Sequence, residues 1–353
     1  MKTLYVYPGT FSPPTFGHLN VARQAAAIFP EVLILCSENP NKNQTWFTPA
    51  ECQRLWSSYS LPQNVTISTL AEFQPQLNQK TDIVMIRGLR SAADYEEEKR
   101  VMLYNHEKFG IDKCLYIFGH KRHQNISSSR VRQEVEQLKL DQLSQQVSPL
   151  VISALLEKVL KIKNIFLVVG QPGSGKSTLL KKLTEIDSRN YHINTDDFNH
   201  QLKDLLKKDL SESDLIKMAI EEEAKIKRII ARPWFELLTQ SLKSAPAGSN
   251  VFVEVPYGLQ TDKAMWRFVG GKIIYVGCED EAINLNRINA RGTPQLAAFI
   301  KKIPNRLETK KIVKKHRLNA SYINTNCSWL ELAQKAEKIN HLIMGGNENA
   351  YDL

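Results

Sequence analysis

The stretch that decides the fold is Tyr7-Pro8-Gly9-Thr10-Phe11-Ser12-Pro13-Pro14-Thr15-Phe16-Gly17-His18. It follows an apolar run, Leu4–Tyr7, and precedes a segment of helical character, Leu19–Phe29. A strand that ends in a Gly/Pro turn before a helix presents backbone N–H groups to an anion, which the helix dipole also favours. Thr10, Thr15 and His18 add side-chain donors to the same turn. These residues predict a nucleotide site at the end of the first strand.

The composition is that of an ordinary globular protein with room for two domains. The chain has 353 residues, 42% hydrophobic and 24% charged, and its formal net charge is +10. A basic protein suits acidic ligands such as nucleotides. The positive charge is spread out, with a denser part at Lys301–Arg317, so nucleic acid is a disfavoured partner. No apolar run approaches the ~20 residues of a membrane span and the N-terminus leads straight into a strand, so we expect no membrane association and a cytoplasmic location.

The cysteines are scattered along the chain, without Cys-x-x-Cys spacing or histidine-rich partners. This distribution predicts reduced, structural thiols rather than a disulfide framework or a zinc site. The five positions are Cys36, Cys52, Cys114, Cys278 and Cys327.

The first half of the chain alternates expected strands and helices. This alternation predicts an α/β fold with a doubly wound parallel sheet, whose ligands bind at the carboxyl ends of the strands. The expected strands are Leu4–Tyr7, Val32–Cys36, Val65–Ser68, Ile83–Ile86 and Cys114–Phe118, and the expected helices are Leu19–Phe29, Ala50–Ser58, Ala92–Lys108 and Ser129–Leu138.

Polar motifs follow several of these strands at their carboxyl ends. Asn39–Lys42 follows the second strand and delivers one lysine. Arg87–Arg90 reads Arg-Gly-Leu-Arg and places two arginines on an expected turn, before the acidic segment Asp94–Glu98. Ser127–Ser129 stands at an expected helix start, where hydroxyls and N–H groups can hold phosphate oxygens.

The ordered set of motifs resembles phosphopantetheine adenylyltransferases over residues 1 to about 160. The Thr-x-Gly-His form alone marks the nucleotidyltransferase superfamily, whereas the Arg-Gly-Leu-Arg turn together with three serines is much more specific. The set is Gly9-Thr10-Phe11, Thr15-x-Gly17-His18, Lys42, Arg87-Gly88-Leu89-Arg90, Asp94-x-Glu96-x-Glu98 and Ile126-Ser127-Ser128-Ser129.

The resemblance implies transfer of AMP from MgATP to 4′-phosphopantetheine, which yields dephospho-CoA and pyrophosphate. The substrate's own phosphate is the nucleophile, so the protein positions it and neutralises charge on the α-phosphate. The resemblance implies that His18 donates to that phosphate, with Thr10 and Lys42 clamping the incoming one. The remaining implied contacts are Arg90 and Ser127–Ser129 on the β- and γ-phosphates, Arg87 on the pantetheine side, Glu98 near the adenosine, and Gly9, Phe11 and Gly17 in the nucleotide-binding turn.

Three departures from that family bear on substrate recognition. Ser12 stands where the family usually has Asp, and Glu97 stands where an aromatic residue is usual. His120–Asn125 forms a polar approach to the serines. These departures leave the phosphate-binding residues in place but could loosen substrate recognition.

A second nucleotide motif opens the other half of the chain. An apolar helix pattern at Gln142–Lys161 closes the first expected domain, 1–161, and a short linker leads to the second, 164–353. The buried-strand run Ile165–Val169 is followed by Gly-x4-Gly-Lys-Ser, the P-loop pattern in its strand–loop–helix context. Its main-chain N–H groups would cradle the β-phosphate, with Lys176 across the β- and γ-phosphates and the Ser177 hydroxyl on Mg²⁺. The loop residues expected to bind nucleotide are Gly170, Gly173, Ser174, Gly175, Ser177 and Thr178.

Two further features complete the expected kinase site. Asp196 ends a short strand and would contact the acceptor hydroxyl, or the metal through water; a helix-capping role stays open. Arg287 and Arg291 are four residues apart on an expected helix, so they share a face and could close over the phosphates as a lid. An ordinary basic surface is the alternative. The expected second sheet again places the domain in the α/β class.

This half resembles dephospho-CoA kinase more loosely. His-Pro is usual where Arg232-Pro233 stands before an expected helix, and Leu-Leu-Phe-Glu is usual where Tyr257–Gln260 stands. Together the halves suggest a fused, bifunctional enzyme of coenzyme A biosynthesis that uses ATP and Mg²⁺. A kinase with another acceptor stays open: ribosylnicotinamide, a sugar, a nucleoside or a polynucleotide end. A nucleotide-sensing regulatory or nucleic-acid-binding protein and a homo-oligomer also stay open.

Overall fold

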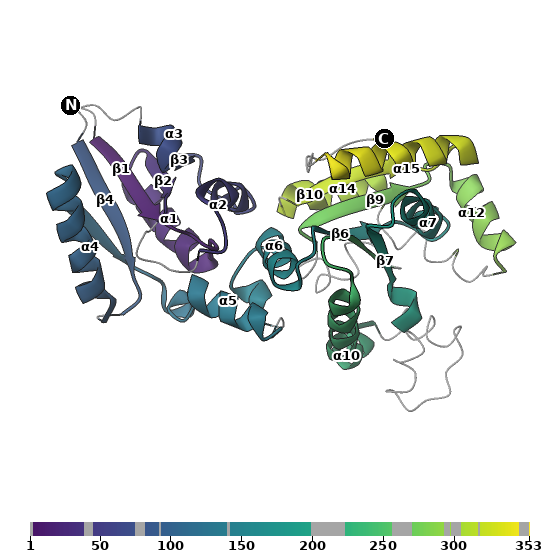
Figure 1. The fold of residues 1–353 in the computed structure, drawn as a ribbon, viewed down its shortest axis with the longest axis horizontal. Coiled ribbons are helices and arrows are strands. Elements are labelled where there is room, and N and C mark those ends of the chain that lie inside the picture. The colour runs from purple at the N-terminus through teal and green to yellow at the C-terminus, as the bar shows by residue number, and fades with distance from the viewer. Residues whose placement is uncertain are drawn as a thin grey trace. The chain divides into compact units, whose positions relative to one another are not determined.

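The computed structural model describes residues 3–38, 45–74, 82–91, 93–139, 142–198, 223–255, 270–292, 297, 305–316, 318–345 and 353. Its contacts divide the chain into two compact units, Met1–Ile152 and Ser153–Leu353. Each unit contains one five-stranded parallel sheet with helices beside it (Figure 1). The predicted α/β class with two parallel sheets is confirmed.

The sheet of the first unit has the strand order β3-β2-β1-β4-β5, so the first strand is central. All four neighbouring pairs run parallel. Each expected strand is present, and most are longer by one or more residues. The strands are β1 (Thr3–Gly9), β2 (Val32–Cys36), β3 (Val65–Thr69), β4 (Asp82–Leu89) and β5 (Lys113–Phe118).

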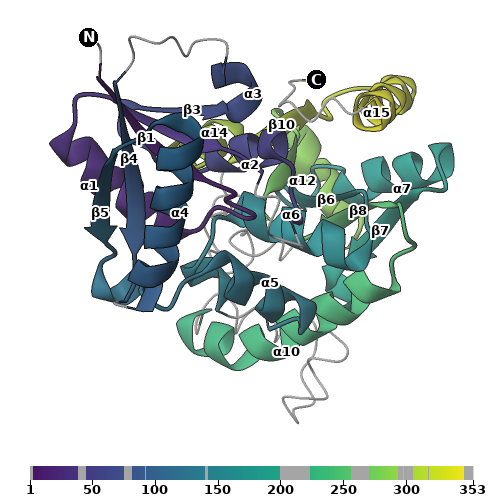
Figure 2. The same cartoon turned by 60° about the vertical axis from the view of Figure 1, so that its left-hand side comes forward.

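Helices cover both faces of this sheet, and Figures 1 and 2 show α1 and α4 on opposite faces. Helix α1 begins three residues earlier than expected, because Thr15 caps it. Helix α6 runs across the division between the two units. The helices are α1 (Phe16–Ile28), α2 (Pro49–Trp56), α3 (Leu70–Phe73), α4 (Ala93–Phe109), α5 (Ser128–Glu136) and α6 (Pro149–Leu160), with short 3-10 turns η2 (Lys121–His123) and η3 (Leu143–Gln145).

The Arg-Gly-Leu-Arg motif was expected on a turn, but Arg87, Gly88 and Leu89 lie in β4. A Cβ atom on Gly88 would lie 2.8 Å from a methyl carbon of Val21, a buried residue of α1. The glycine therefore lets α1 pack directly against β4. This close approach keeps the motif within the sheet and brings the start of α1 near the end of β4.

The sheet of the second unit has the order β10-β9-β6-β8-β7, with the strand before the P-loop in the centre. All four neighbouring pairs run parallel. The strands are β6 (Asn164–Val169), β7 (Asn190–Asn194), β8 (Asn250–Glu254), β9 (Lys272–Gly277) and β10 (Asn319–Asn324). The helices are α7 (Lys176–Ile186), α10 (Glu223–Ser244), α12 (Glu281–Ala290), α14 (Arg306–His316) and α15 (Trp329–Met344), with a 3-10 turn η4 (Thr195–Asp197).

Helices α7 and α15 pack side by side on one face of this sheet (Figure 1). Burying apolar surface at roughly 25 cal/mol per Å² is the main stabilising contribution in such a core. The buried core residues are Phe166, Val168, Leu179, Leu180, Leu183, Phe252, Ile274, Val276, Ile323, Leu332, Ala336, Ile339 and Ile343.

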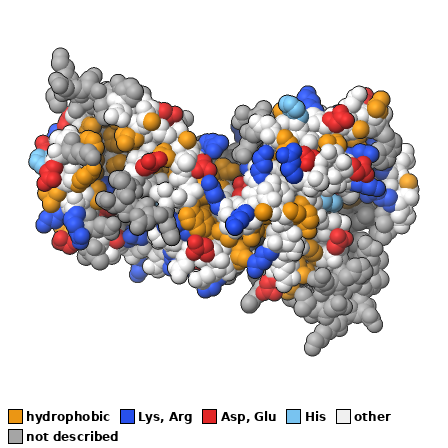
Figure 3. All heavy atoms as spheres, viewed as in Figure 1, with side chains coloured by type: hydrophobic (Ala, Val, Ile, Leu, Met, Phe, Trp, Pro, Cys, Tyr) orange, Lys and Arg blue, Asp and Glu red, His pale blue; other side chains and the backbone are white. Residues whose placement is uncertain are grey.

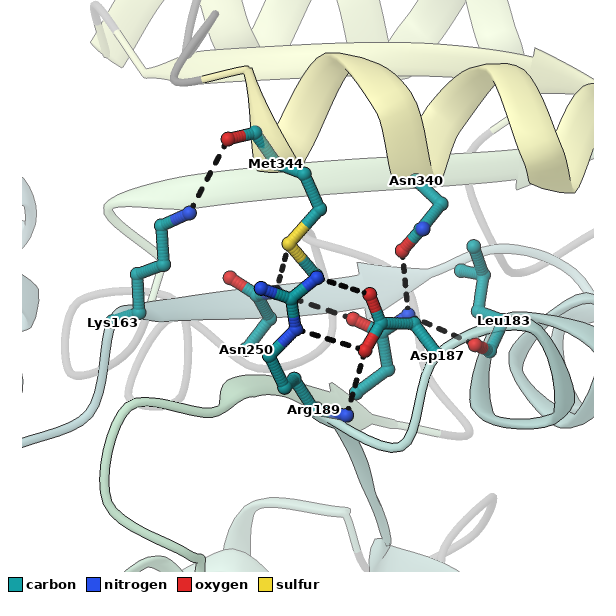
Figure 4. Close-up of polar contacts among 8 residues, drawn as sticks. Lys163, Leu183, Asp187, Arg189, Asn250, Asn340 and Met344 are labelled. Atoms are coloured by element: carbon teal, nitrogen blue, oxygen red, sulfur yellow. Dashed lines mark hydrogen bonds and ion pairs between the residues drawn. The ribbon is translucent and has the colours of Figure 1, made fainter.

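A chain of asparagines joins the strands at the amino edge of the second sheet, opposite the P-loop. The Asn164 amide donates to Asn250 (2.9 Å), which donates to Asn190 (3.2 Å). Asn190 in turn donates to Asn340 of α15 (2.8 Å). Figure 4 shows this region, with Asn250 and Asn340 from different elements and the ion pair of Asp187 with Arg189 beside them. Since Asn164 and Asn250 are buried, each amide must be matched to a partner.

One expectation for the second half of the chain is wrong, and others concern residues that the structure does not describe. Pro233 lies inside α10, not before a helix. Tyr257–Gln260 and most of Asp204–Arg232, which we expected to be a solvated helical face, lie outside the described residues. Within Lys301–Arg317, residues 306–316 form α14. Lys and Arg side chains are distributed over the face drawn in Figure 3, with Asp and Glu among them.

Candidate functional site

The first candidate site is the turn between β1 and α1. Thr15 caps the helix, and its side-chain oxygen accepts from the backbone N–H of His18 (3.4 Å). The backbone N–H of Thr15 donates in return to Nδ1 of His18 (3.1 Å). A neutral imidazole that accepts at Nδ1 carries its proton on Nε2. The reciprocal cap therefore fixes the tautomer in which His18 donates from Nε2, as a phosphate ligand requires.

Two residues predicted to bind nucleotide shape this turn from inside. The ring of Phe11 is 3% exposed and packs edge-on against His18, with centroids 5.1 Å apart. A Cβ on Gly9 would lie 2.8 Å from the Phe11 ring, so glycine is required there. Phe11 has φ 43°, a strained value for a bulky residue and one that is typical of functional sites. Both residues support the turn, and Thr10 beside them is half-buried.

Side chains from elsewhere in the unit hold the carbonyl groups of the turn. Arg132 of α5 donates to the carbonyl of Ser12, and Ser128 donates to that of Pro13 (2.8 Å). The Tyr59 hydroxyl donates to the carbonyl of Pro14 (2.8 Å). Three consecutive carbonyls are thus tied back, so the turn is held in one conformation before any ligand binds.

Ser12, where the related family usually has Asp, has a structural partner in this chain. Its side chain is 2% exposed, and its hydroxyl oxygen accepts from the backbone N–H groups of Trp46 (2.9 Å) and Phe47 (3.0 Å). The serine therefore joins the segment before α2 to the turn between β1 and α1. Lys42, the predicted clamp for the incoming phosphate, lies outside the described residues.

The three serines reach the same turn but do different things. The segment before them lies against the start of α1, because a Cβ on Gly17 would be in ordinary contact with the carbonyl of Ile126 (3.5 Å). Ser127 caps α5 by accepting from the N–H of Arg130 (3.2 Å). The hydroxyl proton of Ser128 is committed to Pro13, and Ser129 accepts from Arg132 (3.4 Å). An acceptor bond from arginine leaves the Ser129 hydroxyl proton able to face a phosphate.

Arg87 and Glu98, which the resemblance assigns to different substrates, bind one another. The guanidinium forms a two-point ion pair with the carboxylate, through Nε and through Nη2 (2.8 Å), and Nη1 donates to the Pro8 carbonyl (3.0 Å). Burial lowers the pKa of Arg87, but the bond to Glu98 outweighs it and leaves that pKa raised. The pair joins β4, α4 and the end of β1 as one rigid wall of the site.

Arg90 lies at the carboxyl end of β4 with about half of its side chain exposed. Asp94, one helical turn onward, accepts from its guanidinium (3.1 Å) and from its backbone N–H (2.9 Å). Burial raises the pKa of Asp94, but the bonds from Arg90 outweigh this and the net shift is downward. Asp94 therefore stays ionised and holds Arg90 at the strand end, next to the predicted phosphate site.

The second candidate site is the P-loop between β6 and α7. Gly173 and Gly175 have φ of 74° and 86°, values that side-chain-bearing residues rarely adopt. Lys176 is 8% exposed, and its ammonium donates to the carbonyl of Gly170 (2.9 Å). Ser177 is exposed and Thr178 half-buried at the first turn of α7. This is the strand–loop–helix geometry that binds phosphates.

The residue that sequence reasoning missed is Glu254, which ends β8. Its carboxylate is 4% exposed and accepts from Ser177 Oγ (2.8 Å) and His192 Nε2 (2.9 Å). Burial raises its pKa, but the bonds from His192 and Ser177 and the charge of Lys176 outweigh burial, so the pKa is lowered. The signal was present in the sequence, because an acidic residue directly follows the apolar run 251–253.

Asp196 and Arg291 act on the same lysine through their charges. Burial is the main cause that lowers the pKa of Lys176; Glu254 and Asp196 raise it and Arg291 lowers it. Asp196, Glu254 and Arg291 therefore each lie within electrostatic reach of Lys176. Arg287 instead donates to the carbonyls of Gly173 (3.5 Å) and Thr325 (3.1 Å). The predicted pair of lid arginines thus has two different environments.

The residues that would hold Mg²⁺ in the second unit are the Ser177 hydroxyl and a carboxylate. Within the described ranges, no group of three or more His, Cys, Asp and Glu side chains could hold a metal ion alone. An ionised, buried Glu254 beside Ser177 fits an ion that is also bound by nucleotide phosphates. No helix in the described part of the chain is long and apolar enough to cross a membrane.

The parallel sheet with a capped His18 turn and an α5 serine cap is the site of a nucleotidyltransferase. A cytidylyltransferase-like family model matches residues 6–134. Phosphopantetheine adenylyltransferase from Corynebacterium glutamicum strain R is 36% identical over 126 residues, which cover 35% of this chain and 78% of that protein. The enzyme from Mannheimia succiniciproducens is 33% identical over 161 residues, covering 45% and 99%. Through its N-terminal part, the chain belongs to the phosphopantetheine adenylyltransferase family.

Solved structures give a weaker likeness that spans both units. A NadR protein in complex with NR is 14% identical and covers 99% of this chain and 88% of that chain, with a TM-score of 0.31. A NadR protein in complex with NAD and AMP-PNP is 13% identical, covering 100% and 91%, also with a TM-score of 0.31.

Proposed function

We propose that the N-terminal unit transfers AMP from MgATP to 4′-phosphopantetheine. The observation that carries this proposal is the 33% identity across 99% of a phosphopantetheine adenylyltransferase. The arrangement of the donors supports it: His18 lies in the first turn of α1, Arg90 directly follows β4, and Ser129 lies in the first turn of α5.

In the proposed reaction, an oxygen of the 4′-phosphate attacks the α-phosphorus of ATP. The bond from that phosphorus to the α,β-bridging oxygen breaks, and pyrophosphate leaves with the electron pair. His18 Nε2–H donates to an α-phosphate oxygen, while Arg90 and the start of α5 neutralise the leaving pyrophosphate. Such preorganised donors supply most of the acceleration when the nucleophile needs no deprotonation. Lys42 and Thr10 are proposed to hold the incoming phosphate.

For the C-terminal unit, we propose an ATP-dependent kinase whose acceptor is the ribose 3′-hydroxyl of dephospho-CoA. The hydroxyl oxygen attacks the γ-phosphorus, the bond to the β,γ-bridging oxygen breaks, and ADP leaves. Asp196 is proposed to take the hydroxyl proton. Ser177 and Glu254 would hold Mg²⁺, which neutralises phosphate charge when bound. Lys176 contacts the β- and γ-phosphates.

Mass spectrometry of the products tests both proposals in one incubation with 4′-phosphopantetheine and MgATP. We expect dephospho-CoA first and CoA later. Dephospho-CoA that accumulates would uphold the first activity and refute the acceptor proposed for the second. A screen of ribosylnicotinamide, sugars, nucleosides and polynucleotide ends would then follow. If neither product forms, the pantetheine assignment is wrong, and the substitutions at Ser12 and Glu97 become the first suspects.

A further inference from the structure

The apex of the P-loop is held from behind by a residue to which no role has yet been assigned, Thr325. It follows β10 directly and is 2% exposed. Its hydroxyl lies 2.5 Å from the carbonyl oxygen of Ser174 and 3.1 Å from that of Gly277. Its backbone N–H donates to the Gly277 carbonyl (2.8 Å). Thr325 thereby joins the P-loop to the ends of β9 and β10.

Arg287 of α12 supports the same junction. One guanidinium nitrogen donates to the Thr325 carbonyl (3.1 Å), and the other lies 3.4 Å from the Thr325 hydroxyl and 3.5 Å from the Gly173 carbonyl. The apex also packs tightly on α12, because a Cβ on Gly173 would lie 2.5 Å from the side-chain oxygen of Asn284. The P-loop, α12 and the end of β10 are therefore closely packed against one another.

The geometry of the peptide group makes this junction relevant to phosphate binding. A trans peptide is planar, so its carbonyl oxygen and its N–H point in opposite directions. When Thr325 holds the carbonyl of Ser174 on one side, the N–H of Gly175 in the same peptide is directed to the other. A P-loop binds phosphate through such N–H groups, and their fixed orientation lowers the entropy lost on binding.

We propose that Thr325 is a positioning residue of the nucleotide site, which fixes the Ser174–Gly175 peptide for phosphate binding with Arg287 as its support. This inference rests on the proposed nucleotide site of the second unit. It also changes the role of Arg287 from a lid arginine to a clamp behind the loop. Arg291, which is the C-cap residue of α12, is then the remaining candidate for a lid arginine.

The test is calorimetric binding of MgADP to the full chain. Thr325→Val keeps the shape and burial of the side chain but removes the hydroxyl, and we expect binding to weaken about tenfold. Thr325→Ser restores the hydroxyl and should bind MgADP within about threefold of the parent chain. Thr309→Val is the matched control, because Thr309 is a buried threonine of α14 in the same unit.

The outcomes separate the inference from the function on which it rests. If the parent chain does not bind MgADP, the proposed nucleotide site is wrong and the inference falls with it. If the parent binds and Thr325→Val binds equally well, or Thr325→Ser fails to restore affinity, only the positioning role is overturned. A purely structural threonine would lower the unfolding temperature in Thr325→Val and Thr309→Val alike, without a selective loss of affinity. Should Thr325→Val not fold, Arg287→Lys is the second variant, with about threefold weaker MgADP binding expected and unchanged binding contradicting the clamp.

Discussion

The two turns for which we propose phosphate binding occupy the same place in similar sheets but are built in different ways. Each follows the central strand of its sheet and precedes a helix. The P-loop bends through glycines with positive φ, whereas the turn after β1 bends at Phe11 and two buried prolines, Pro13 and Pro14. In both, carbonyl groups are tied back by side chains from distant elements.

The difference concerns which groups are offered to the ligand. A glycine-lined loop brings main-chain N–H groups close to phosphate, so it depends on the absence of side chains. The first turn is filled by the ring of Phe11 and offers side chains instead, above all His18. We therefore expect the second site to be sensitive to any added methyl group and the first to be sensitive to the loss of particular functional groups.

The largest effect should follow from adding a methyl group to the P-loop. A Cβ on Gly170 would lie 2.0 Å from the carbonyl oxygen of Val276, at a cost of about 3 kcal/mol or more. Gly170→Ala should abolish binding of MgATP to the second unit and spare adenylyl transfer. In the matched variant Gly17→Ala, the new Cβ makes only ordinary contacts of 3.4 Å or more. Calorimetry and product assays on both would refute the contrast if Gly17→Ala were the more damaging.

Removing the imidazole of His18 should have the next largest effect. His18→Ala removes a preorganised donor to the α-phosphate and should lower kcat for dephospho-CoA formation about 10²–10³-fold. His18→Gln separates catalysis from folding, because glutamine at this helix position can still accept from the Thr15 N–H. We expect its unfolding temperature to stay near that of the parent while its kcat falls as far as that of the alanine variant. A glutamine variant with parental kcat would show that His18 acts only as a cap.

Much of this contrast could be predicted from the sequence. The P-loop pattern and the Gly-His turn each stand between an apolar run and a helix, and local signals of this kind mark strand–turn–helix units well. The alternation of expected strands and helices also predicted that the strands run parallel and that the three serines stand at the start of a helix.

The partners of individual side chains could not be predicted, because they depend on packing between elements distant in sequence. Arg87 and Glu98 were assigned to separate substrates, yet they form an ion pair across β4 and α4. Arg287 was expected on a lid, but the packing of α12 against the end of β10 turns it toward Thr325. Glu254 could have been found, since a lone carboxylate ending an apolar strand has few structural reasons to be there.

The asparagines at the amino edge of the second sheet allow a test of whether nucleotide binding by the P-loop depends on the stability of the whole second unit. Asn250→Leu removes the middle of the asparagine chain and leaves the amides of Asn164 and Asn190 each without one partner. We expect the second unit to lose about 2–6 kcal/mol of stability, from two unmatched buried groups at roughly 1–3 kcal/mol each. Hydrogen exchange in β8 would report this loss. The affinity for MgADP at low temperature should remain, and a parallel loss of affinity would show that the loop depends on the whole sheet.

We expect the smallest effects from substitutions of two neighbouring serines of α5. These substitutions distinguish positioning from binding at the first site. Ser128 donates to the Pro13 carbonyl, so Ser128→Ala should loosen the turn that carries His18 and lower kcat about threefold to tenfold, at an unchanged KM for ATP. Ser129→Ala should instead raise the KM for ATP, because Ser129 accepts from Arg132 and its hydroxyl proton remains available to the proposed phosphate. Steady-state kinetics of the two variants distinguish a positioning role from a binding role. A KM effect in Ser128→Ala equal to that in Ser129→Ala would mean that both hydroxyls contact phosphate, and the first turn would then resemble the P-loop in relying on several equivalent donors.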